Sequence, residues 1–363
     1  MSDLNSLKKL RDEIDQTDQQ IQLLINQRAK FAQQVAEIKK GEEGADVVYY
    51  RPEREAEVLR KVMERNEGPL GNEDMAKLFR EVMSACLALE EPVKVAFLGP
   101  EGTFTQAAAI KHFGHWARSF PMSAIDEVFR EVAAGAVNYG VVPVENSTEG
   151  VVNHTLDNFV DSSVKICGEV ELRIHHHLLV SDTTRKDKIS RIYSHAQSLA
   201  QCRKWLDANY PHAERVAVSS NGEAAKRIQT EWHSAAIAGD MAAELYNLEK
   251  MASNIEDRPD NSTRFLIIGS QDVPPSGEDK TSLMISVKNQ PGALHSLLEP
   301  FHKAKIDLTR IETRPSAAGV WSYVFFIDFN GHCTKTDVIA VLKEIEPYAA
   351  EIKLLGSYPR AVL

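Results

Sequence analysis

The sequence predicts a multidomain protein with three successive parts: an all-α helical domain over residues 1–91, an α/β domain over 93–271, and a small α+β, ferredoxin-like domain over 280–358. Three observations predict this division. Residues before Glu91-Pro92 show helical periodicity, short apolar runs alternate with helical stretches after them, and a linker rich in Pro, Gly and acidic residues precedes the last part. A chain of 363 residues is long enough for two or three domains.

The first part predicts three helices. Apolar residues recur every seven positions from Leu7, and no proline interrupts residues 3–40, so we expect one long helix there. After a polar, glycine-containing break at 41–45, helical patterns cover residues 52–64 and 72–90. The helix expected at 52–64 begins with Pro52, and proline suits a first helical turn.

Seven short apolar runs predict buried strands in the second part. They are Lys94–Leu98, Gly140–Val144, His177–Val180, Arg191–Ser194, Arg215–Ser219, Ala235–Ala238 and Phe265–Ile268. Helical patterns lie between most of them. We therefore expect an α/β domain whose ligand lies at the carboxyl ends of the strands, where loops converge.

The third part follows a linker at 272–279 and predicts the order βαββαβ. The expected elements are a strand at 282–287, a turn at 289–292, a helix to 303, strands at 306–312 and 320–329, a helix at 335–346 and a strand near 351–355. This order is typical of a ferredoxin-like sandwich, a plan that carries no chemistry of its own.

The composition excludes several classes of protein. A net charge of −10 argues against nucleic acid as a partner, because phosphate binding needs basic surface. No apolar run approaches the roughly 18–20 residues of a membrane span, and the first residues lack the pattern of a signal peptide. We expect a cytoplasmic protein with small-molecule ligands and no membrane partner. The four cysteines are too far apart to suggest a disulfide framework or a zinc site.

Three cations interrupt the apolar stripe of the long helix. Lys39 follows Arg28 by 11 residues, about 16.5 Å along the axis and about 20° around it, so both can reach one small ligand. Arg11 is 28 residues from Lys39, about 42 Å on a straight helix, so a shared site must take Arg11 from a second copy of the chain. On helix geometry alone, a solvated charge row on a coiled-coil dimer is favoured over a ligand site.

The helical part resembles a known family. The motif from Leu10 to Asp15, the cations Arg28 and Lys39, the pair Arg54-Glu55 and the stretch from Ser84 to Glu90 are similar to the chorismate mutase domain of bacterial P-proteins, over residues 3–91. The resemblance implies an intertwined homodimer that rearranges chorismate to prephenate without a cofactor. It also implies roles: Arg11 and Arg28 bind the substrate carboxylates, Lys39 donates to the ether oxygen with Arg54 nearby, and Glu55 accepts from the ring hydroxyl.

Two positions differ from the common pattern of that family. Cys86 stands where a serine is usual, and Glu90 stands where a glutamine often donates a second hydrogen bond to the ether oxygen. An ionised carboxylate only accepts hydrogen bonds, so Glu90 has to be protonated to serve. We therefore expect a mutase that is favoured at lower pH.

The α/β part carries polar motifs beside its predicted strands. Glu145-Asn146, Ser194 with Gln201 seven positions later, and the triplet Thr263-Arg264-Phe265 resemble the prephenate dehydratase domain, over residues 93–270. That family has a two-lobed fold related to periplasmic ligand-binding proteins. The resemblance implies loss of carbon dioxide and water from prephenate to give phenylpyruvate. It assigns Thr263 to the departing hydroxyl, Arg264 to a carboxylate or a structural role, and Glu145, Asn146, Ser194 and Gln201 to substrate orientation.

Three consecutive histidines, His175 to His177, do not favour a metal site. Successive side chains of an extended strand point to opposite faces, and no cysteine or carboxylate lies nearby at ligand spacing. We expect no metal and no cofactor.

Two stretches of the last part, Pro291 to His295 and Glu312 to Pro315, resemble the signature stretches of the ACT regulatory domain, over residues 280–358. The resemblance implies phenylalanine binding between paired domains and feedback inhibition. The implied ligand residues are Gly292, Ala293, Leu294, Glu312, Thr313, Arg314 and Pro315.

The resulting hypothesis is a bifunctional homodimeric enzyme of phenylalanine biosynthesis, with chorismate and prephenate as substrates and phenylalanine as effector. Two alternatives stay open. A two-lobed binding fold with an ACT domain could form a non-catalytic amino-acid sensor, and the helical part could be a dimerisation arm without mutase activity on an active dehydratase.

Overall fold

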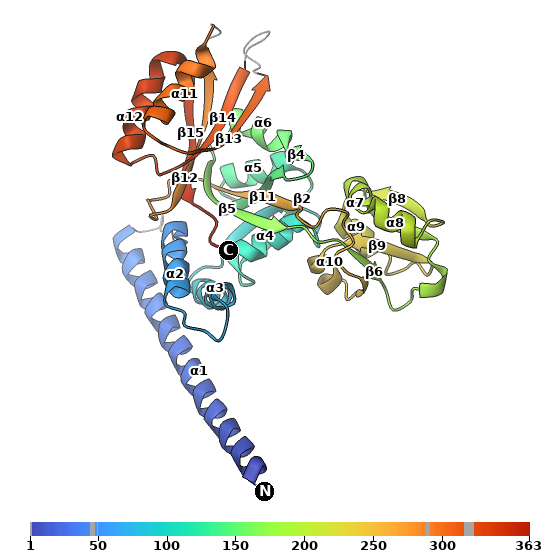
Figure 1. Ribbon diagram of the computed structural model, residues 1–363. Helices are drawn as coiled ribbons and strands as arrows, with labels where there is room; N and C mark the ends of the chain where they lie inside the picture. Colours follow the sequence, from blue (N-terminus) through green and yellow to red (C-terminus); the bar gives the residue numbers. More distant parts are fainter. Residues whose placement is uncertain (1, 44–47, 49, 288–290, 316–322) are drawn as a thin grey trace.

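The computed structural model describes residues 2–43, 48, 50–287, 291–315 and 323–363 (Figure 1). A helical domain, a two-lobed α/β domain and a C-terminal α+β domain follow one another along the chain, so the predicted fold class is confirmed. Within the described part, none of the helices combines the length and apolar character needed to cross a bilayer.

The helical domain consists of α1 (Ser2–Glu43), α2 (Pro52–Glu64) and α3 (Asn72–Ala88). Helix α1 runs past Gly41, so the break expected at 41–45 starts later, and residues 44–45 lie outside the described residues. Helices α2 and α3 pack on each other, whereas α1 projects from the body of the molecule (Figure 1). Side chains 5–27 of α1 are all exposed, although many are apolar: Leu10 is 57% and Ile14 58% exposed.

The first lobe of the α/β domain has a sheet in the order β2-β1-β3-β11-β5, with β4 beside β3. Its elements are β1 (Lys94–Leu98), β2 (Arg118–Met122), β3 (Tyr139–Asn146), β4 (Gly150–Val151), β5 (Lys165–Arg173), β11 (Ser262–Gly269), α4 (Phe104–Phe113), α5 (Ile125–Ala133) and α6 (Asn153–Asp161). Strands β1, β2 and β3 are parallel, and β11 runs antiparallel to β3 and β5. The chain therefore enters the second lobe after β5 and returns from it into β11.

The second lobe has a sheet in the order β10-β6-β9-β7-β8. Its elements are β6 (His177–Val180), β7 (Arg191–His195), β8 (Glu214–Val218), β9 (Ser234–Ala238), β10 (Glu249–Ala252), α7 (Ala196–Gln201), α8 (Arg203–Asn209), α9 (Asn221–Arg227), α10 (Asp240–Leu245) and the short 3₁₀ helix η2 (Lys186–Lys188). All seven predicted strands are present. The sequence did not predict β2, β4, β5 and β10. Strands β2 and β10 are mostly exposed, and Gly168 and Glu169 interrupt the apolar run of β5.

The C-terminal domain has the predicted order βαββαβ and a sheet in the order β13-β14-β12-β15. Its elements are β12 (Asp279–Val287), α11 (Ala293–Lys303), β13 (Leu308–Pro315), β14 (Tyr323–Asn330), α12 (Thr336–Ile345), the 3₁₀ helix η3 (Glu346–Tyr348) and β15 (Ala349–Pro359). Residues 289–290 of the expected turn and 320–322 of the expected strand lie outside the described residues.

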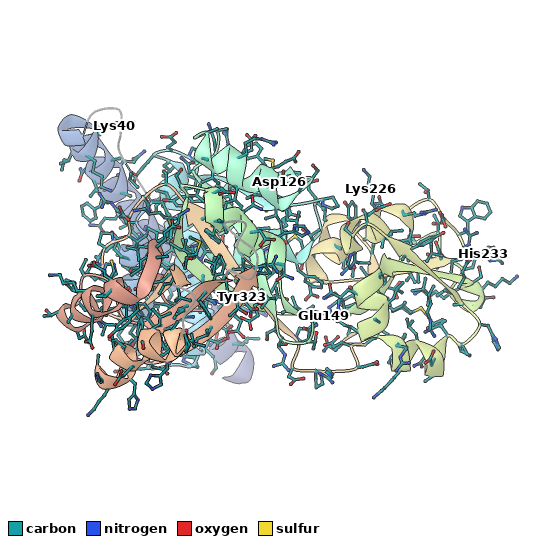
Figure 2. The ribbon with its side chains drawn as sticks, turned by 90° about the horizontal axis from the view of Figure 1, so that it is seen from above. Lys40, Asp126, Glu149, Lys226, His233 and Tyr323 are labelled. Atoms are coloured by element: carbon teal, nitrogen blue, oxygen red, sulfur yellow. The ribbon has the colours of Figure 1, made fainter. Side chains whose placement is uncertain are left out.

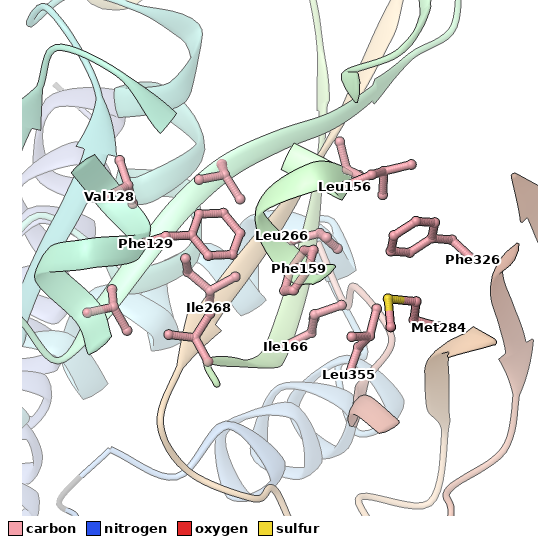
Figure 3. Close-up of a cluster of buried hydrophobic side chains, with 14 of the residues drawn as sticks. Val128, Phe129, Leu156, Phe159, Ile166, Leu266, Ile268, Met284, Phe326 and Leu355 are labelled. Atoms are coloured by element: carbon pink, nitrogen blue, oxygen red, sulfur yellow. The ribbon is translucent and has the colours of Figure 1, made fainter. Parts of the chain in front are cut away.

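One apolar core joins the first lobe to the C-terminal domain. Phe129, Phe159 and Ile268 of the lobe form a continuous cluster with Met284 and Phe326 of the C-terminal sheet (Figure 3). The backbones are also close, since a Cβ atom on Gly356 would lie 2.2 Å from the carbonyl oxygen of Ile166. The C-terminal sheet is thus packed directly on the sheet that leads to the cleft described below.

Candidate active sites

A cleft of about 910 Å³ separates the two lobes of the α/β domain. Its first-lobe wall comes from the ends of β1, β2 and β3 and the start of α4, including Gly99, Phe104 and Asn146. Its second-lobe wall includes His195, Gln201 and Asn221, which follow β7 and β8. The carboxyl ends of the parallel strands open into this cleft, where the sequence places a ligand.

Asn146 and Thr263 meet in the cleft because they are register partners on β3 and β11. The side-chain nitrogen of Asn146 donates to the Thr263 hydroxyl at 2.8 Å. The orientation of this amide is fixed, since its oxygen accepts from the backbone N–H groups of Thr148 and Glu149, both at 3.0 Å. The Thr263 hydroxyl is therefore a hydrogen-bond acceptor toward Asn146, and its own proton is available to a bound molecule.

Gln201 links the lobes at the same place. Its oxygen accepts from Asn261 at 3.2 Å and meets the Nε2 atom of His176 at 2.8 Å, and its nitrogen donates to the Thr148 hydroxyl at 3.1 Å. Burial lowers the pKa of His176, so the ring is neutral and carries its proton on Nε2 toward Gln201. One hydrogen-bonded chain thus runs from the second lobe to the Asn146–Thr263 pair.

Ser194 does not line the cleft, although the resemblance implies substrate orientation. It is fully buried at the end of β7, where its hydroxyl contacts the carbonyl oxygen of Ile237 at 2.7 Å and the side-chain oxygen of Asn221 at 3.0 Å. Asn221 does line the cleft. Ser194 therefore reaches a bound molecule only through Asn221.

Glu145 and Arg264, which the resemblance assigns to substrate orientation and to a carboxylate or structural role, are not among the described residues that line the cleft. Each is the strand neighbour of a cleft residue, and neighbouring side chains of a strand point to opposite faces. Arg264 pairs with Glu169 at 2.8 Å and with Asp328 of β14 at 2.6 Å. Glu145 pairs with Arg310 of β13 at 3.3 Å. Arg264 thus has the structural role that the sequence left open.

The three histidines each have a separate partner. His175 contacts Glu256 at 2.8 Å, His177 contacts Asp240 at 3.1 Å, and His176 contacts Gln201. Across the described ranges, no group of three potential metal ligands comes together.

In the helical domain, Lys39 and Glu90 are close enough to interact electrostatically. Burial raises the pKa of Glu90 above its ordinary value, and the charges of Lys39 and Lys40 oppose the rise. Arg28 is half-buried on the same stretch of α1, and Cys86 is buried in α3. Arg54 is exposed and pairs with Glu57 at 3.1 Å. The side chain of Arg11 is exposed in the projecting half of α1, away from all of these residues.

Glu55 does not lie beside Lys39. It is half-buried in an ion pair with Arg80 at 3.3 Å, and Arg80 donates to the carbonyl oxygen of Lys111 in the first lobe at 2.7 Å. A second acidic group that interacts with Lys39, besides Glu90, is Glu53, whose pKa burial raises and whose Oε2 atom has no hydrogen-bond partner among the described residues. The resemblance did not assign a role to Glu53, and the alternation of acids at 53, 55 and 57 does not by itself distinguish them.

In the C-terminal domain, Gly292 adopts a left-handed conformation at φ +80° and directly precedes α11, in which Ala293 is buried and Leu294 exposed. Alternate residues of the edge strand β13 face opposite ways: Thr313 and Pro315 are exposed, whereas Glu312 and Arg314 are half-buried. Arg314 donates to both oxygens of Asp157 in α6, at 2.9 and 2.7 Å. One of the implied effector residues is therefore in contact with the first lobe.

Comparisons with known proteins agree with this three-part structure. Residues 10–91 match the family of type II chorismate mutases, residues 95–273 match prephenate dehydratase, and residues 281–346 match the ACT domain. The chain is 66% identical over 365 residues to the bifunctional chorismate mutase/prephenate dehydratases of Stutzerimonas stutzeri and Pseudomonas aeruginosa. Each alignment covers 100% of this chain and 100% of the relative. This chain belongs to the bifunctional chorismate mutase/prephenate dehydratase family.

A solved structure supports the same assignment for the dehydratase and ACT domains. The prephenate dehydratase of Arthrobacter aurescens, solved in complex with L-Phe, is 33% identical and superposes with a TM-score of 0.69. The match covers 74% of this chain and 90% of that protein. The chain is thus a bifunctional enzyme with a chorismate mutase and a prephenate dehydratase domain, followed by an ACT domain, as its sequence predicts.

The dehydratase cleft contains a cation that the motifs did not indicate. Lys226 lies on α9 and lines the cleft from the second lobe (Figure 2). Among the described cleft residues it is the one with a permanent positive charge. The acidic residue of the same helix, Glu223, accepts a hydrogen bond from the backbone N–H of Ser219 at 3.0 Å. A lysine on an otherwise ordinary helix gives no sequence signal of a site.

Proposed function

We propose that the enzyme converts chorismate to phenylpyruvate at two separate sites, and that phenylalanine bound to the ACT domain inhibits the dehydratase step. The observation that carries the proposal is the Asn146–Thr263 pair, which presents a hydroxyl proton to a cleft of suitable size for a small dianion. Prephenate supplied to the purified enzyme should yield phenylpyruvate, and added phenylalanine should lower the rate. Binding of prephenate without turnover would favour the sensor alternative.

The mutase site is proposed to use Arg28, Lys39 and Glu90 of one chain with Arg11 of a second copy. The continuous helix α1 places Arg11 far beyond the reach of Lys39 on the same chain. The apolar stripe of α1 is exposed in the single chain, so we expect another protein surface to pack on it. A homodimer in which the two α1 helices pair would satisfy both. The rearrangement breaks the C–O ether bond as a new C–C bond forms, so the enzyme needs only to hold a compact conformer and to stabilise negative charge on the ether oxygen.

The mutase should lose activity as pH rises through the raised pKa of Glu90. A protonated Glu90 donates to the ether oxygen, and an ionised one repels the developing negative charge. The Glu90→Gln variant keeps a donor at every pH, so its chorismate turnover should not decline over the range in which the wild type declines. A decline of equal steepness in Glu90→Gln would contradict this role, and prephenate turnover of the same preparation controls for damage by pH.

The dehydratase reaction is proposed to use Thr263 as the proton donor to the departing ring hydroxyl. The bond between the ring and its carboxylate breaks, its electrons enter the ring, and the C–O bond of the hydroxyl breaks, which gives carbon dioxide, water and the aromatic product. The Thr263 proton leaves with the hydroxyl and is replaced from solvent. Asn146 holds the Thr263 oxygen in place, and Gln201 keeps the two lobes in register around the substrate.

Lys226 is proposed to bind a carboxylate of prephenate across the cleft, because the Arg264 guanidinium already pairs with Glu169 and Asp328. Lys226→Met retains most of the aliphatic stem and removes the charge. We expect the KM for prephenate to rise about 10-fold or more with a smaller change in kcat, since charge-assisted bonds contribute about 1.5–3 kcal/mol. Lys204→Met, on α8 of the same lobe and not among the residues that line the cleft, is the matched control. An unchanged KM in Lys226→Met would remove this residue from the binding site.

Phenylalanine is proposed to bind at the ACT domain near Gly292 and the exposed face of β13, between two copies of the domain. The support is the resemblance of these stretches and the L-Phe complex of the Arthrobacter aurescens relative. Inhibition requires that phenylalanine favour one of two states of the dimer.

A further inference from the structure

Asn146 and Thr263 each have a sequence neighbour whose side chain pairs with the ACT domain. These neighbours are Glu145 and Arg264. Strands β3 and β11 pair Asn146 with Thr263 on the cleft face and Glu145 with Arg264 on the opposite face. The ladder is irregular at this point, because the register shifts between Arg264 and Phe265. On its other side β11 pairs regularly with β5 through Thr263, so the irregularity lies on the β3 side, between Thr263 and the rest of the ladder.

Charged side chains of the ACT sheet meet both neighbours. The Arg264 guanidinium donates to Asp328 at 2.6 Å and to the Tyr358 hydroxyl at 3.0 Å, in addition to Glu169. Arg310 of β13 pairs with Glu145 at 3.3 Å. Lys280 of β12 pairs with Glu169 at 2.7 Å, and Ser282 donates to Asp328 at 2.6 Å.

This cluster is internally balanced and largely buried. Three cations, Arg264, Lys280 and Arg310, face three anions, Glu145, Glu169 and Asp328; of the six side chains only that of Glu145 is more than 16% exposed. Removal of one charge leaves an uncompensated buried partner, which the structure can relieve only by moving the strands that carry the cluster. Strands β3 and β11 are among them.

We propose that Arg264 and Glu145 are positioning residues of the dehydratase, which hold Thr263 and Asn146 in their productive geometry through Asp328 and Arg310 of the ACT domain. The inference rests on the proposed role of the Asn146–Thr263 pair. It makes the ACT domain a part of the dehydratase active site even when no effector is bound.

The test is the Asp328→Asn variant, assayed without phenylalanine. Asp328 is not among the described residues that line the cleft, so a purely structural residue there would change stability and leave the kinetics of folded enzyme intact. A misplaced donor lowers kcat, and displacements of about 1 Å cost about 100-fold in rate. We expect kcat for prephenate to fall about 10- to 100-fold, KM to stay within about twofold, and chorismate turnover by the same chains to be unchanged.

Lys353→Met is the matched control. Lys353 also joins the ACT domain to the first lobe, but its side-chain nitrogen donates to the carbonyl oxygens of Phe159, Val160 and Ser162 at the end of α6 rather than to residues of β3 or β11. We expect its kcat to be close to wild type. If Asp328→Asn lowers the yield of folded protein, Ser282→Ala keeps the charge of Asp328, removes the hydrogen bonds of the Ser282 hydroxyl to Asp328 and to the Tyr358 hydroxyl, and should lower kcat in the same direction.

Three outcomes separate the claims. A wild-type kcat in Asp328→Asn, or an equal loss in Lys353→Met, would overturn the positioning role. Wild-type enzyme that does not turn over prephenate would instead overturn the proposed function. A loss of kcat restricted to Asp328→Asn and Ser282→Ala supports the inference.

Discussion

Thr263→Val is expected to lower prephenate turnover by about 100-fold or more and to leave chorismate turnover unchanged. The substitution replaces the hydroxyl with a methyl group of similar volume, so the strand and the cleft keep their shape. What it removes is the proton that the departing ring hydroxyl needs and the acceptor that the Asn146 amide meets at 2.8 Å. Steady-state rates with each substrate, measured on one preparation, provide the comparison.

The control is Ser262→Ala, which removes a hydroxyl from the preceding residue of β11. Ser262 is not among the residues that line the cleft, so its variant should retain dehydratase turnover. A Thr263→Val enzyme with wild-type kcat would show that the hydroxyl departs without this donor. Equal losses in both variants would point to strand geometry rather than proton donation.

Arg11→Ala and Lys39→Met are each expected to lose nearly all mutase activity, and a mixture of the two is expected to recover part of it. If each site combines Arg11 of one copy with Lys39 of the other, a mixed dimer contains one intact site and one doubly altered site. Random exchange of equal amounts makes half of the dimers mixed, so about a quarter of wild-type chorismate turnover should return. The single variants should keep full dehydratase turnover, because the residues lie on α1.

Lys61→Met provides the control for the loss of a lysine. Lys61 is exposed on α2 and pairs with Glu57 at 3.9 Å, so its substitution should not affect the mutase. Mixtures that stay inactive after subunit exchange has been demonstrated would show that Arg11 and Lys39 act in the same chain or that α1 pairs differently.

Much of the fold could be predicted because its signals are local. The seven-residue apolar repeat of α1 and the short apolar runs of the buried strands report periodicity and burial directly. The Asn146 and Thr263 motifs were grouped through the family resemblance, and the structure brings them together because β11 runs antiparallel to β3 and begins where β3 ends. Strands β2, β5 and β10 could not be predicted because none of them has a continuous apolar run.

The faces of the strands could not be predicted, and this decided which motif residues reach the cleft. Glu145-Asn146 and Thr263-Arg264 are adjacent in the sequence, and only the register of β3 and β11 shows which member faces substrate. From the sequence alone, Arg264 could bind a carboxylate of the substrate. In the structure its guanidinium instead pairs with Asp328 of the ACT sheet, 64 residues away. The position of Lys226 in the cleft could not be predicted, because this residue belongs to no motif and lines the cleft only where the two lobes approach each other.

The helical domain shows the same limit. Helix geometry predicted that Arg11 is too far from Lys39 on one chain, and the unbroken α1 bears this out. The identity of the acid beside Lys39 depends on how α2 is rotated. The resemblance assigned Glu55 to the ring hydroxyl of the substrate, and in the structure this residue pairs with Arg80 next to the first lobe.

The most direct test of the account is to incubate the purified enzyme with chorismate, with and without phenylalanine, and to identify the products by mass. The account predicts phenylpyruvate, in an amount that falls when phenylalanine is present. Accumulated prephenate would confine activity to the helical domain, and untouched chorismate together with turnover of added prephenate would make that domain a dimerisation arm. Chorismate and prephenate that both remain unconverted would contradict the central claim.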